Sequence, residues 1–270
     1  MVLSSSPAGG AGGVRAHERA SASIWHDLEC GAYRADLPVW RELAMEAGSG
    51  ASARPLLDVG AGTGRVALDL AARGHRVTAL DLEAQLLGTL SERAHVAGTS
   101  IDTVCADARE LELGRCDFAV CLVPMQTIQL LGGAAGRLAF LRRARQHLRP
   151  GGLLACAIVS QIDAFDCAAG DLGPSPEVAR IDGVNYVSRA TRVHVDARTV
   201  RIERERSIFS AEQAATGTQP PAERDLIELD RVSVTQLRHE GHQAGLEFTG
   251  MRAIPATRDH VGSEVVLFHA

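Results

Sequence analysis

The stretch that decides the fold is Leu56-Leu-Asp-Val-Gly-Ala-Gly-Thr-Gly64, an apolar run followed at once by alternating glycines. The segment after it repeats apolar residues at helical spacing, with Val66, Ala67 and Leu70 on one face. This order predicts a strand, a tight turn and a helix. Glycines let a ligand approach the backbone of such a turn closely, and the amino end of the helix favours an anionic group.

The same alternation continues along the chain. Further strands are predicted at residues 76–80, 101–105, 118–123 and 153–159. Because amphipathic helical segments separate these apolar runs, the pattern is typical of a parallel sheet covered on both faces. We therefore expect an α/β fold with a doubly wound sheet.

After Ser160 the pattern changes. Residues 163–183 are rich in Gly, Pro and Asp and are predicted to form a loop. Residues 186–195 and 199–206 then alternate in polarity about a turn, as an antiparallel hairpin does. The remaining elements expected are a short strand at 226–232, a helix at 235–245, and strands at 248–254 and 264–268.

Composition excludes several kinds of chemistry. All 28 basic residues are arginine, so no lysine exists to form a Schiff base or to bind a nucleotide phosphate in a P-loop. A net charge of −5 with 4% aromatic residues gives no sign of a nucleic-acid partner. The six cysteines lack metal-ligand spacing, and no metal site is expected. Without a signal peptide or an apolar span, the chain is predicted to be cytoplasmic, with no membrane partner.

Acidic residues mark the ends of three predicted strands. Asp58 lies just ahead of the glycine turn, Asp81 ends the second strand and Asp107 follows the third. Ligands of open parallel sheets bind outside the carboxyl ends of the strands, where these side chains would converge. A carboxylate at Asp81 can accept both ribose hydroxyls of an adenosine, and one at Asp107 can reach an adenine amino group. The alternatives are structural: backbone capping by Asp58 or Asp81, and ordinary turn chemistry at Asp107.

In these residues the chain resembles the class I S-adenosylmethionine-dependent methyltransferases. The match covers about residues 55–160, and the final helix and two strands fit the reversed C-terminal hairpin of that family. It rests on Leu57-Asp-Val-Gly-Ala-Gly-Thr-Gly64, Ala79-Leu-Asp81, Ala106-Asp-Ala108, Cys116-Asp-Phe118 and Leu148-Arg-Pro-Gly-Gly152. The resemblance implies a Rossmann-like, mostly parallel sheet with a reversed C-terminal strand, an antiparallel β insert after the fifth strand, and S-adenosyl-L-methionine as cofactor.

The residue pattern and the resemblance together imply a division of the chain. Residues 1–16 are expected to be a disordered tail, and 17–270 a single domain. Its parts are a helical lid (17–50), a cofactor-binding core (55–160), a loop with an antiparallel cap insert (161–232), and a final helix with two strands (233–270).

By position, the resemblance implies a cofactor site around the glycine turn and the acidic strand ends. Gly60, Ala61 and Gly62 are implied to line the methionine part of the cofactor, with Asp58 near its amino group. Asp81 is implied to hold the ribose, and Leu82 to pack on the adenine. Asp107 and the Ala108 backbone would meet the adenine amine, and the Leu122 backbone would close the pocket.

A small-molecule or peptide acceptor is expected, with N-methylation slightly favoured over O-methylation. His26 and Tyr33 are acceptor candidates because their segment looks similar to the lid of enzymes related to glycine N-methyltransferase. Gln126 and Gln129 follow the fourth strand, beside the expected methyl position. No catalytic residue is assigned, since the donor is already activated and a base is optional for an amine that arrives neutral.

Two other functions remain open at this point. An NAD(P)-dependent oxidoreductase would use the same fold, although Arg65 stands where the third glycine of its fingerprint belongs. A non-catalytic protein of the same fold would bind the cofactor without turnover. The sequence leaves the oligomeric state open, with a dimer as one possibility.

Overall fold

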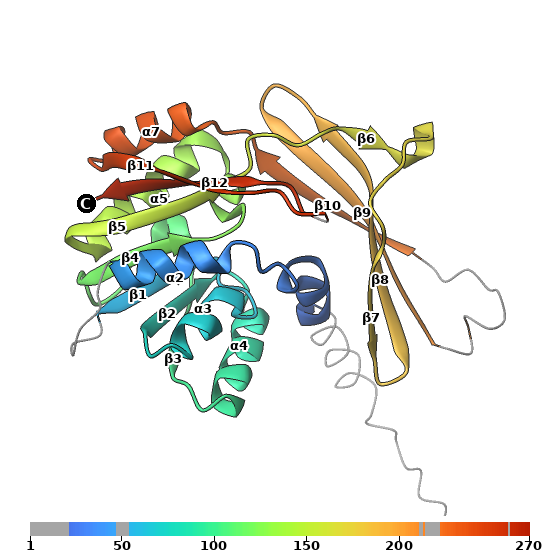
Figure 1. The fold of residues 1–270 in the computed structure, drawn as a ribbon, viewed down its shortest axis with the longest axis horizontal. Helices are drawn as coiled ribbons and strands as arrows, with labels where there is room; N and C mark the ends of the chain where they lie inside the picture. Colours follow the sequence, from blue (N-terminus) through green and yellow to red (C-terminus); the bar gives the residue numbers. More distant parts are fainter. Residues whose placement is uncertain (1–21, 47–53, 211–212, 214–221, 259) are drawn as a thin grey trace, which may run out of the picture.

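The computed structural model describes residues 22–46, 54–210, 213, 222–258 and 260–270, and it contains two sheets (Figure 1). The expected tail at residues 1–16 lies outside this part of the chain. No helix among the described residues is long and apolar enough to cross a membrane.

The larger sheet has seven strands in the order β11-β12-β5-β4-β1-β2-β3. Strands β1 to β5 pair in parallel, whereas β12 is antiparallel to both of its neighbours, β5 and β11. This confirms the mostly parallel sheet with a reversed C-terminal strand. The bounds are β1 (Pro55–Val59), β2 (Arg76–Asp81), β3 (Ile101–Cys105), β4 (Phe118–Val123), β5 (Leu148–Ile158), β11 (Glu247–Ile254) and β12 (Ser263–His269).

Helices cover both faces of this sheet, as the apolar strands predict. Residues of α2 (Leu37–Glu46), α3 (Arg65–Ala71) and α4 (Ala84–Val96) join one core cluster. Residues of α5 (Gly133–His147) and α7 (Val234–Gln243) join the cluster on the other face. Strands β1 and β4 are buried along their whole length, because each has a layer of helices on either side.

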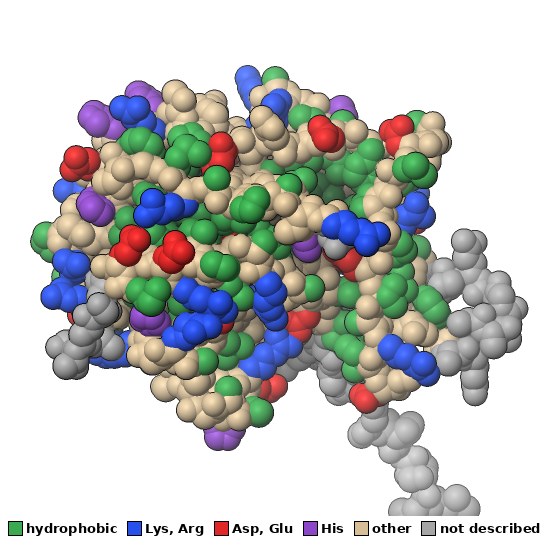
Figure 2. Space-filling view, in the orientation of Figure 1, with side chains coloured by type: hydrophobic (Ala, Val, Ile, Leu, Met, Phe, Trp, Pro, Cys, Tyr) green, Lys and Arg blue, Asp and Glu red, His purple; other side chains and the backbone are tan. Residues whose placement is uncertain are grey.

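The chain between β5 and α7 forms the second sheet, which we call the insert. Its strands are β6 (Phe165–Asp166), β7 (Glu177–Ile181), β8 (Val184–Val195), β9 (Thr199–Ser210) and β10 (Ala222–Asp230), all paired antiparallel. The predicted hairpin is confirmed as β8 and β9. Figure 2 shows a hollow between the core and the insert, with hydrophobic side chains visible inside it.

Several boundaries differ from the sequence predictions, and two of the differences are described here. The segment expected to be a loop, 163–183, contains β6, β7 and the 3-10 turn η4 (Cys167–Ala169). β6 has only two residues, β7 lies within a stretch rich in Gly, Pro and Asp, and both pair with β8. Strand β5 begins at Leu148 instead of 153, because Leu148 pairs with Phe118 ahead of the Pro-Gly-Gly irregularity.

The N-terminal segment lies between the core and the insert. Residues 22–26 are helical and continue into a π-helical turn, η1 (Asp27–Gly31). The ring of Trp25 meets the ring of Tyr186 in β8 edge-on, with centroids 5.6 Å apart. The Glu29 carboxylate forms ion pairs with Arg206 and Arg204 of β9. The first described turns of the chain are therefore attached to the insert by both packing and charge.

Candidate functional site

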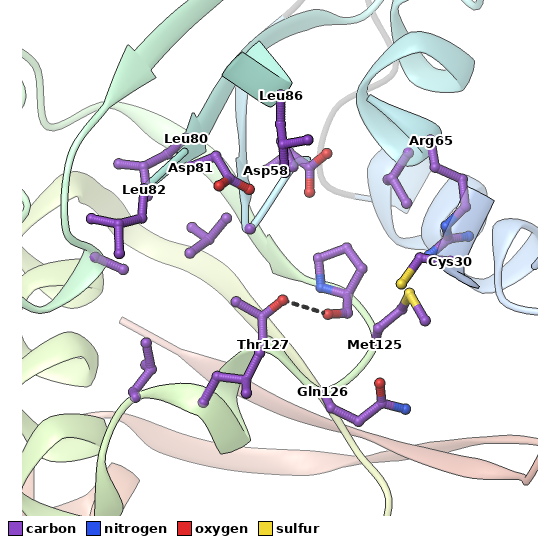
Figure 3. Close-up of a pocket in the computed structure, with 18 of the residues that line it drawn as sticks. Cys30, Asp58, Arg65, Leu80, Asp81, Leu82, Leu86, Met125, Gln126 and Thr127 are labelled. Atoms are coloured by element: carbon purple, nitrogen blue, oxygen red, sulfur yellow. Dashed lines mark hydrogen bonds between the residues drawn. The ribbon is translucent and has the colours of Figure 1, made fainter. Parts of the chain in front are cut away.

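A cavity of about 380 Å³ lies at the carboxyl ends of β1, β2 and β4, beside the turn that joins β1 to α3 (Figure 3). Its size is within the range of about 300–1,000 Å³ found for small-molecule sites. Seven of the nine residues predicted to hold a cofactor line it: Asp58, Gly60, Ala61, Asp81, Leu82, Asp107 and Ala108.

Asp58 is the most unusual group in the cavity wall. Its side chain is 1% exposed, and neither oxygen has a hydrogen-bond partner among the described residues. Burial raises the pKa of this carboxyl to about 7, against smaller opposing effects of the Arg65 guanidinium and the Ala67 amide. A buried, unpaired acceptor of this kind is costly unless a ligand supplies a donor.

Asp81 performs the structural role considered from the sequence and also lines the cavity. One of its oxygens accepts the Gly62 amide at 2.8 Å, and the other accepts the Glu83 amide at 2.9 Å. These two bonds tie the glycine turn after β1 to the end of β2. The remaining lone pairs of the carboxylate are still available to a ligand.

The glycine turn leaves no room for side chains. Gly60 and Gly62 have φ values of +72° and +56°, which glycine adopts most readily. A Cβ at Gly60 would lie 2.5 Å from Thr127, and one at Gly62 would lie 2.3 Å from the Nε2 atom of His26. Gly62 therefore lies under the His26 ring and does not line the cavity, contrary to the prediction.

Asp107 and Leu82 lie at another part of the cavity wall. Asp107 accepts the Arg109 amide at 2.8 Å and pairs with the Arg109 guanidinium, which lowers the pKa of its carboxyl. The turn chemistry considered for Asp107 is therefore present. Leu82, unusually for its residue type, is 64% exposed, so an apolar surface is available to a ligand beside Asp81.

Besides Gly62, three predicted site residues are not brought into the cavity. Leu122 is buried inside the sheet, paired with Asp58, and the wall beyond β4 is formed by residues 124–127 instead. Tyr33 packs its ring against His260, with centroids 4.8 Å apart. Gln129 points away and bonds to backbone groups of Val159 and Asp230.

The other two acceptor candidates, His26 and Gln126, do line the cavity. Burial lowers the pKa of His26, so its ring is neutral near pH 7. The Nδ1 atom of His26 lies 3.3 Å from the Thr63 hydroxyl. The Gln126 amide makes no side-chain hydrogen bond within the described ranges, and its functional groups are free for a ligand.

Several wall residues were not identified as site residues from the sequence. They include Cys30, Met125 and Thr127, which no motif distinguishes. Arg65 also lines the cavity and donates two hydrogen bonds to Asp36, at 2.5 and 2.7 Å. Both side chains are buried, 7% and 1% exposed, which joins α3 to the start of α2. Their separation of 29 positions hides this pair from any local pattern.

No group of three or more His, Cys, Asp or Glu side chains among the described residues is arranged to hold a metal ion. Burial raises the pKa of the Cys30 thiol to about 11, so it stays protonated in the cavity wall.

The strand order with one reversed strand, the glycine turn after β1 and the acidic ends of β1 and β2 define the fold of the class I S-adenosylmethionine-dependent methyltransferases. Residues 56–152 match a protein family described as a methyltransferase domain. Over these residues the chain is therefore similar to methyltransferase domains, and the cofactor of this class is S-adenosylmethionine.

Two curated relatives match about two fifths of the chain. The probable cobalt-precorrin-6B C(15)-methyltransferase (decarboxylating) of Methanothermobacter thermautotrophicus is 33% identical over 123 residues, which cover 43% of this chain and 59% of that protein. The ubiquinone biosynthesis O-methyltransferase of Rickettsia canadensis is 30% identical over 109 residues, with 40% and 42% coverage. The matches thus span less than two thirds of either relative.

Solved structures extend the likeness to the whole fold. A sugar N-methyltransferase of a Streptoalloteichus species aligns with a TM-score of 0.66 at 18% sequence identity, covering 100% of this chain and 96% of that one. At this identity the match shows a shared fold that extends beyond the cofactor-binding core.

The residues of the cavity fit the cofactor of this class. The unpaired Asp58 carboxylate lies beside the glycine turn and is suited to an ammonium group. Asp81 retains acceptor capacity next to the apolar surface of Leu82, a combination suited to a ribose joined to an adenine.

Proposed function

We propose that the protein transfers a methyl group from S-adenosylmethionine to the nitrogen of a small-molecule amine, or of an amine on a peptide. The observation that carries this proposal is the buried, unpaired carboxylate of Asp58 at the glycine turn of a methyltransferase cavity. A cationic or donating ligand group would supply the partner that this carboxylate lacks.

The cofactor would be held by residues from the ends of three strands. Asp58 binds its ammonium group, Asp81 accepts from its ribose hydroxyls, and Leu82 packs on its adenine. Asp107 and the Ala108 backbone meet the adenine amine, while Gly60 and Ala61 border the methionine part. When bound, S-adenosylmethionine supplies a methyl group on a positively charged sulfur, which needs no further activation.

The acceptor would approach from the part of the cavity lined by Gln126 and His26. The side-chain amide oxygen of Gln126 accepts a hydrogen bond from the acceptor N–H and so directs the nitrogen lone pair toward the methyl carbon. Bound S-adenosylmethionine would supply the methyl group to this nitrogen. The proton released afterwards goes to neutral His26 or to water.

The preference for nitrogen rests on these residues. Among the described residues that line the cavity, the one imidazole has a lowered pKa and the Cys30 thiol is protonated, so neither is a strong base. An amine that arrives neutral needs no such base, whereas a hydroxyl does. The names of the relatives include C-, O- and N-methyltransferases, so they leave the acceptor atom open.

Calorimetry and turnover assays test the two halves of the proposal. We expect S-adenosylmethionine to bind at micromolar concentration in preference to NAD(H), and amines in a panel of amines and phenols to yield S-adenosylhomocysteine and a methylated product. Absence of cofactor binding would overturn the whole proposal. Methylation of phenols alone would move the acceptor atom to oxygen, and binding without turnover across the panel would favour a non-catalytic protein.

A further inference from the structure

The segment that follows β4, Pro124–Thr127, is held in an uncommon conformation, and we call it the acceptor turn. Met125 has a φ of +53°, a left-handed value that is uncommon for a residue with a side chain. Such a conformation persists only where the surroundings enforce it. Met125, Gln126 and Thr127 all line the cavity from this turn (Figure 3).

The hydrogen bonds within the turn are local. The Thr127 hydroxyl donates to the Pro124 carbonyl at 3.0 Å, and the Gln129 backbone amide donates to the Gln126 carbonyl at 2.8 Å. These bonds close the short 3-10 helix η3 (Thr127–Leu130), but they do not attach it to another element. Its place relative to the sheet is therefore fixed by the packing of the fully buried Ile128 in the core and by longer hydrogen bonds.

The side chain of Gln129 supplies these longer contacts. Its Nε2 donates to the carbonyls of Val159 at 3.2 Å and of Asp230 at 2.8 Å, and its Oε1 accepts the Val159 amide at 2.8 Å. Gln129 is 1% exposed, so water does not compete for these bonds. One amide thus joins η3 to the end of β5 and to the end of β10.

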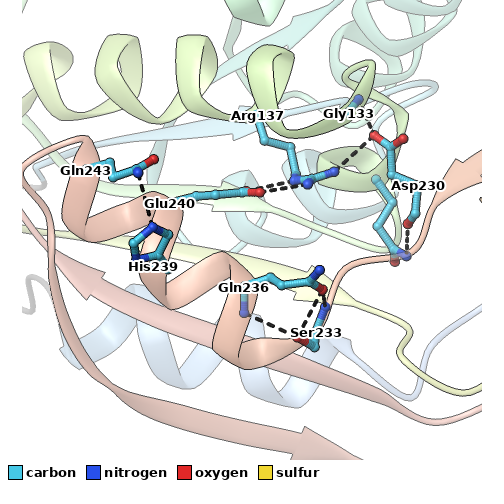
Figure 4. Close-up of polar contacts among 9 residues, drawn as sticks. Gly133, Arg137, Asp230, Ser233, Gln236, His239, Glu240 and Gln243 are labelled. Atoms are coloured by element: carbon cyan, nitrogen blue, oxygen red, sulfur yellow. Dashed lines mark hydrogen bonds and ion pairs between the residues drawn. The ribbon is translucent and has the colours of Figure 1, made fainter. Parts of the chain in front are cut away.

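Asp230 is fixed in turn from the opposite side (Figure 4). Its carboxylate accepts the Gly133 amide at 2.5 Å and an Arg137 N–H at 3.0 Å. Arg137 donates two further hydrogen bonds to Glu240 of α7, at 2.8 and 2.7 Å, and both of these side chains are buried. The helices α5 and α7 therefore brace the residue that meets Gln129.

We propose that Gln129 and Asp230 are positioning residues for the acceptor: through this buried network they hold the strained acceptor turn so that Gln126 faces the methyl position. The inference rests on the proposed function. Neither residue lines the cavity, and the cofactor candidates Asp58 and Asp81 belong to β1 and β2. Loss of the network should thus weaken use of the acceptor and leave cofactor affinity nearly unchanged.

The chain offers a local probe of the turn, because only four methionines are present and Met125 is the one among the described residues that lines the cavity. We would label the methionine methyl groups with carbon-13, assign Met125 with Met125→Leu, and record spectra with and without S-adenosylhomocysteine. The variants are Asp230→Asn and Gln129→Met. Asp166→Asn is a matched control, since Asp166 also accepts a backbone amide and pairs with an arginine, Arg192, but lies in β6.

We expect the Met125 signal to broaden or divide in both network variants and to stay sharp in the control. The signals of Met45 and Met251 should be unchanged, which shows that the fold is intact. A Met125 signal identical in Asp230→Asn and Asp166→Asn would overturn the proposal. If Gln129→Met fails to fold, the milder Asp230→Asn decides.

Kinetics on an amine identified in the panel complete the test. We expect kcat/KM for that amine to fall at least tenfold in Asp230→Asn, with the Kd for S-adenosylmethionine within about twofold of the original protein. If kcat/KM for the amine and the affinity for S-adenosylmethionine fell by the same factor, the network would have only a structural role. If no amine is methylated, the proposed function fails, whereas the Met125 spectra still decide whether the network holds the turn.

Discussion

The carboxylate of Glu29 in η1 accepts two hydrogen bonds from the guanidinium of Arg206 in β9, at 2.8 and 2.7 Å, across 177 positions of sequence. Glu29 also accepts the Ser188 hydroxyl at 2.7 Å. These bonds hold the pKa of the Glu29 carboxyl below its ordinary value despite its burial. The same Arg206 lies over the Trp25 ring, 5.6 Å from its centroid. The segment that covers the glycine turn is therefore anchored to the insert.

Replacing Glu29 by Gln should release that segment, because Arg206 and Arg204 would lose their shared partner. Trp25 would become exposed, and its fluorescence should shift to longer wavelength in a Trp40→Phe background. The control is Glu228→Gln, which removes a pair with Arg201 on exposed parts of the same sheet. Equal emission from both variants would contradict the anchoring role of Glu29.

Because the pKa of the Asp58 carboxyl is raised, we expect the stability of the protein to depend on pH in an unusual way. Its carboxyl titrates near 3.8 when unfolded and near 7 in the folded protein without a ligand. Between these values the folded state binds the additional proton, so this group's contribution to stability is lost as the pH rises from about 4 to 7. Asp58→Asn cannot ionise, so its Tm should exceed that of the original protein at pH 8, and the difference should shrink steadily toward pH 4. A difference in Tm that does not vary with pH would contradict the raised pKa.

The same carboxyl should link cofactor binding to proton release. An ammonium group favours ionised Asp58, so affinity for S-adenosylmethionine should decline as the pH falls below 7. Calorimetry in two buffers of different ionisation enthalpy measures the released proton directly. Asp58→Asn should show weaker binding and less proton release, and unchanged release would assign the proton to another group.

Asp81→Ala should weaken cofactor affinity by about 1–3 kcal/mol, or roughly 5–150-fold, since it removes the acceptor for the ribose and frees the Gly62 amide. Asp81→Asn retains one oxygen acceptor and should lose less affinity for the cofactor than Asp81→Ala. Asp117→Ala, an exposed carboxylate paired with Arg115, provides the control. Calorimetric titration measures all three, and an affinity unchanged in Asp81→Ala would remove Asp81 from the site.

Gln126→Met should lower kcat/KM for the acceptor by about tenfold or more and leave the Kd of S-adenosylmethionine unchanged. The Gln126 side-chain amide is free in the cavity, and a methionine side chain has a similar volume but no amide. Steady-state assays on the amine found in the panel, together with calorimetry, separate these effects. A raised Kd for the cofactor would instead place Gln126 on the cofactor.

The buried pair of Arg65 and Asp36 should matter for stability. Arg65→Met leaves the Asp36 carboxylate buried with Trp40 as a remaining donor. Removal of one partner from a buried ion pair lowers the free energy of unfolding by about 3–5 kcal/mol. Arg115→Met breaks a far more exposed pair and should cost less than about 1 kcal/mol. Denaturant unfolding compares the two, and similar midpoints would argue against a stabilising role for the buried pair.

The sheet and the cofactor side of the cavity could be predicted because their signals are local. An apolar run followed by glycines fixes β1 and its turn, and carboxylates at strand ends meet at one edge of a parallel sheet. Seven of nine predicted cofactor residues line the cavity for this reason. The residues of the acceptor side depend on contacts between distant segments. Tyr33 packs on His260 and Gln129 reaches Asp230, and no local pattern encodes either contact.

The insert leaves the core after Val159 and returns at Asp230, and a single side chain, that of Gln129, touches both points. Its two junctions with the core are therefore neighbours in space. A module whose ends meet in this way can be lengthened, shortened or replaced in evolution without moving the strands that hold the cofactor.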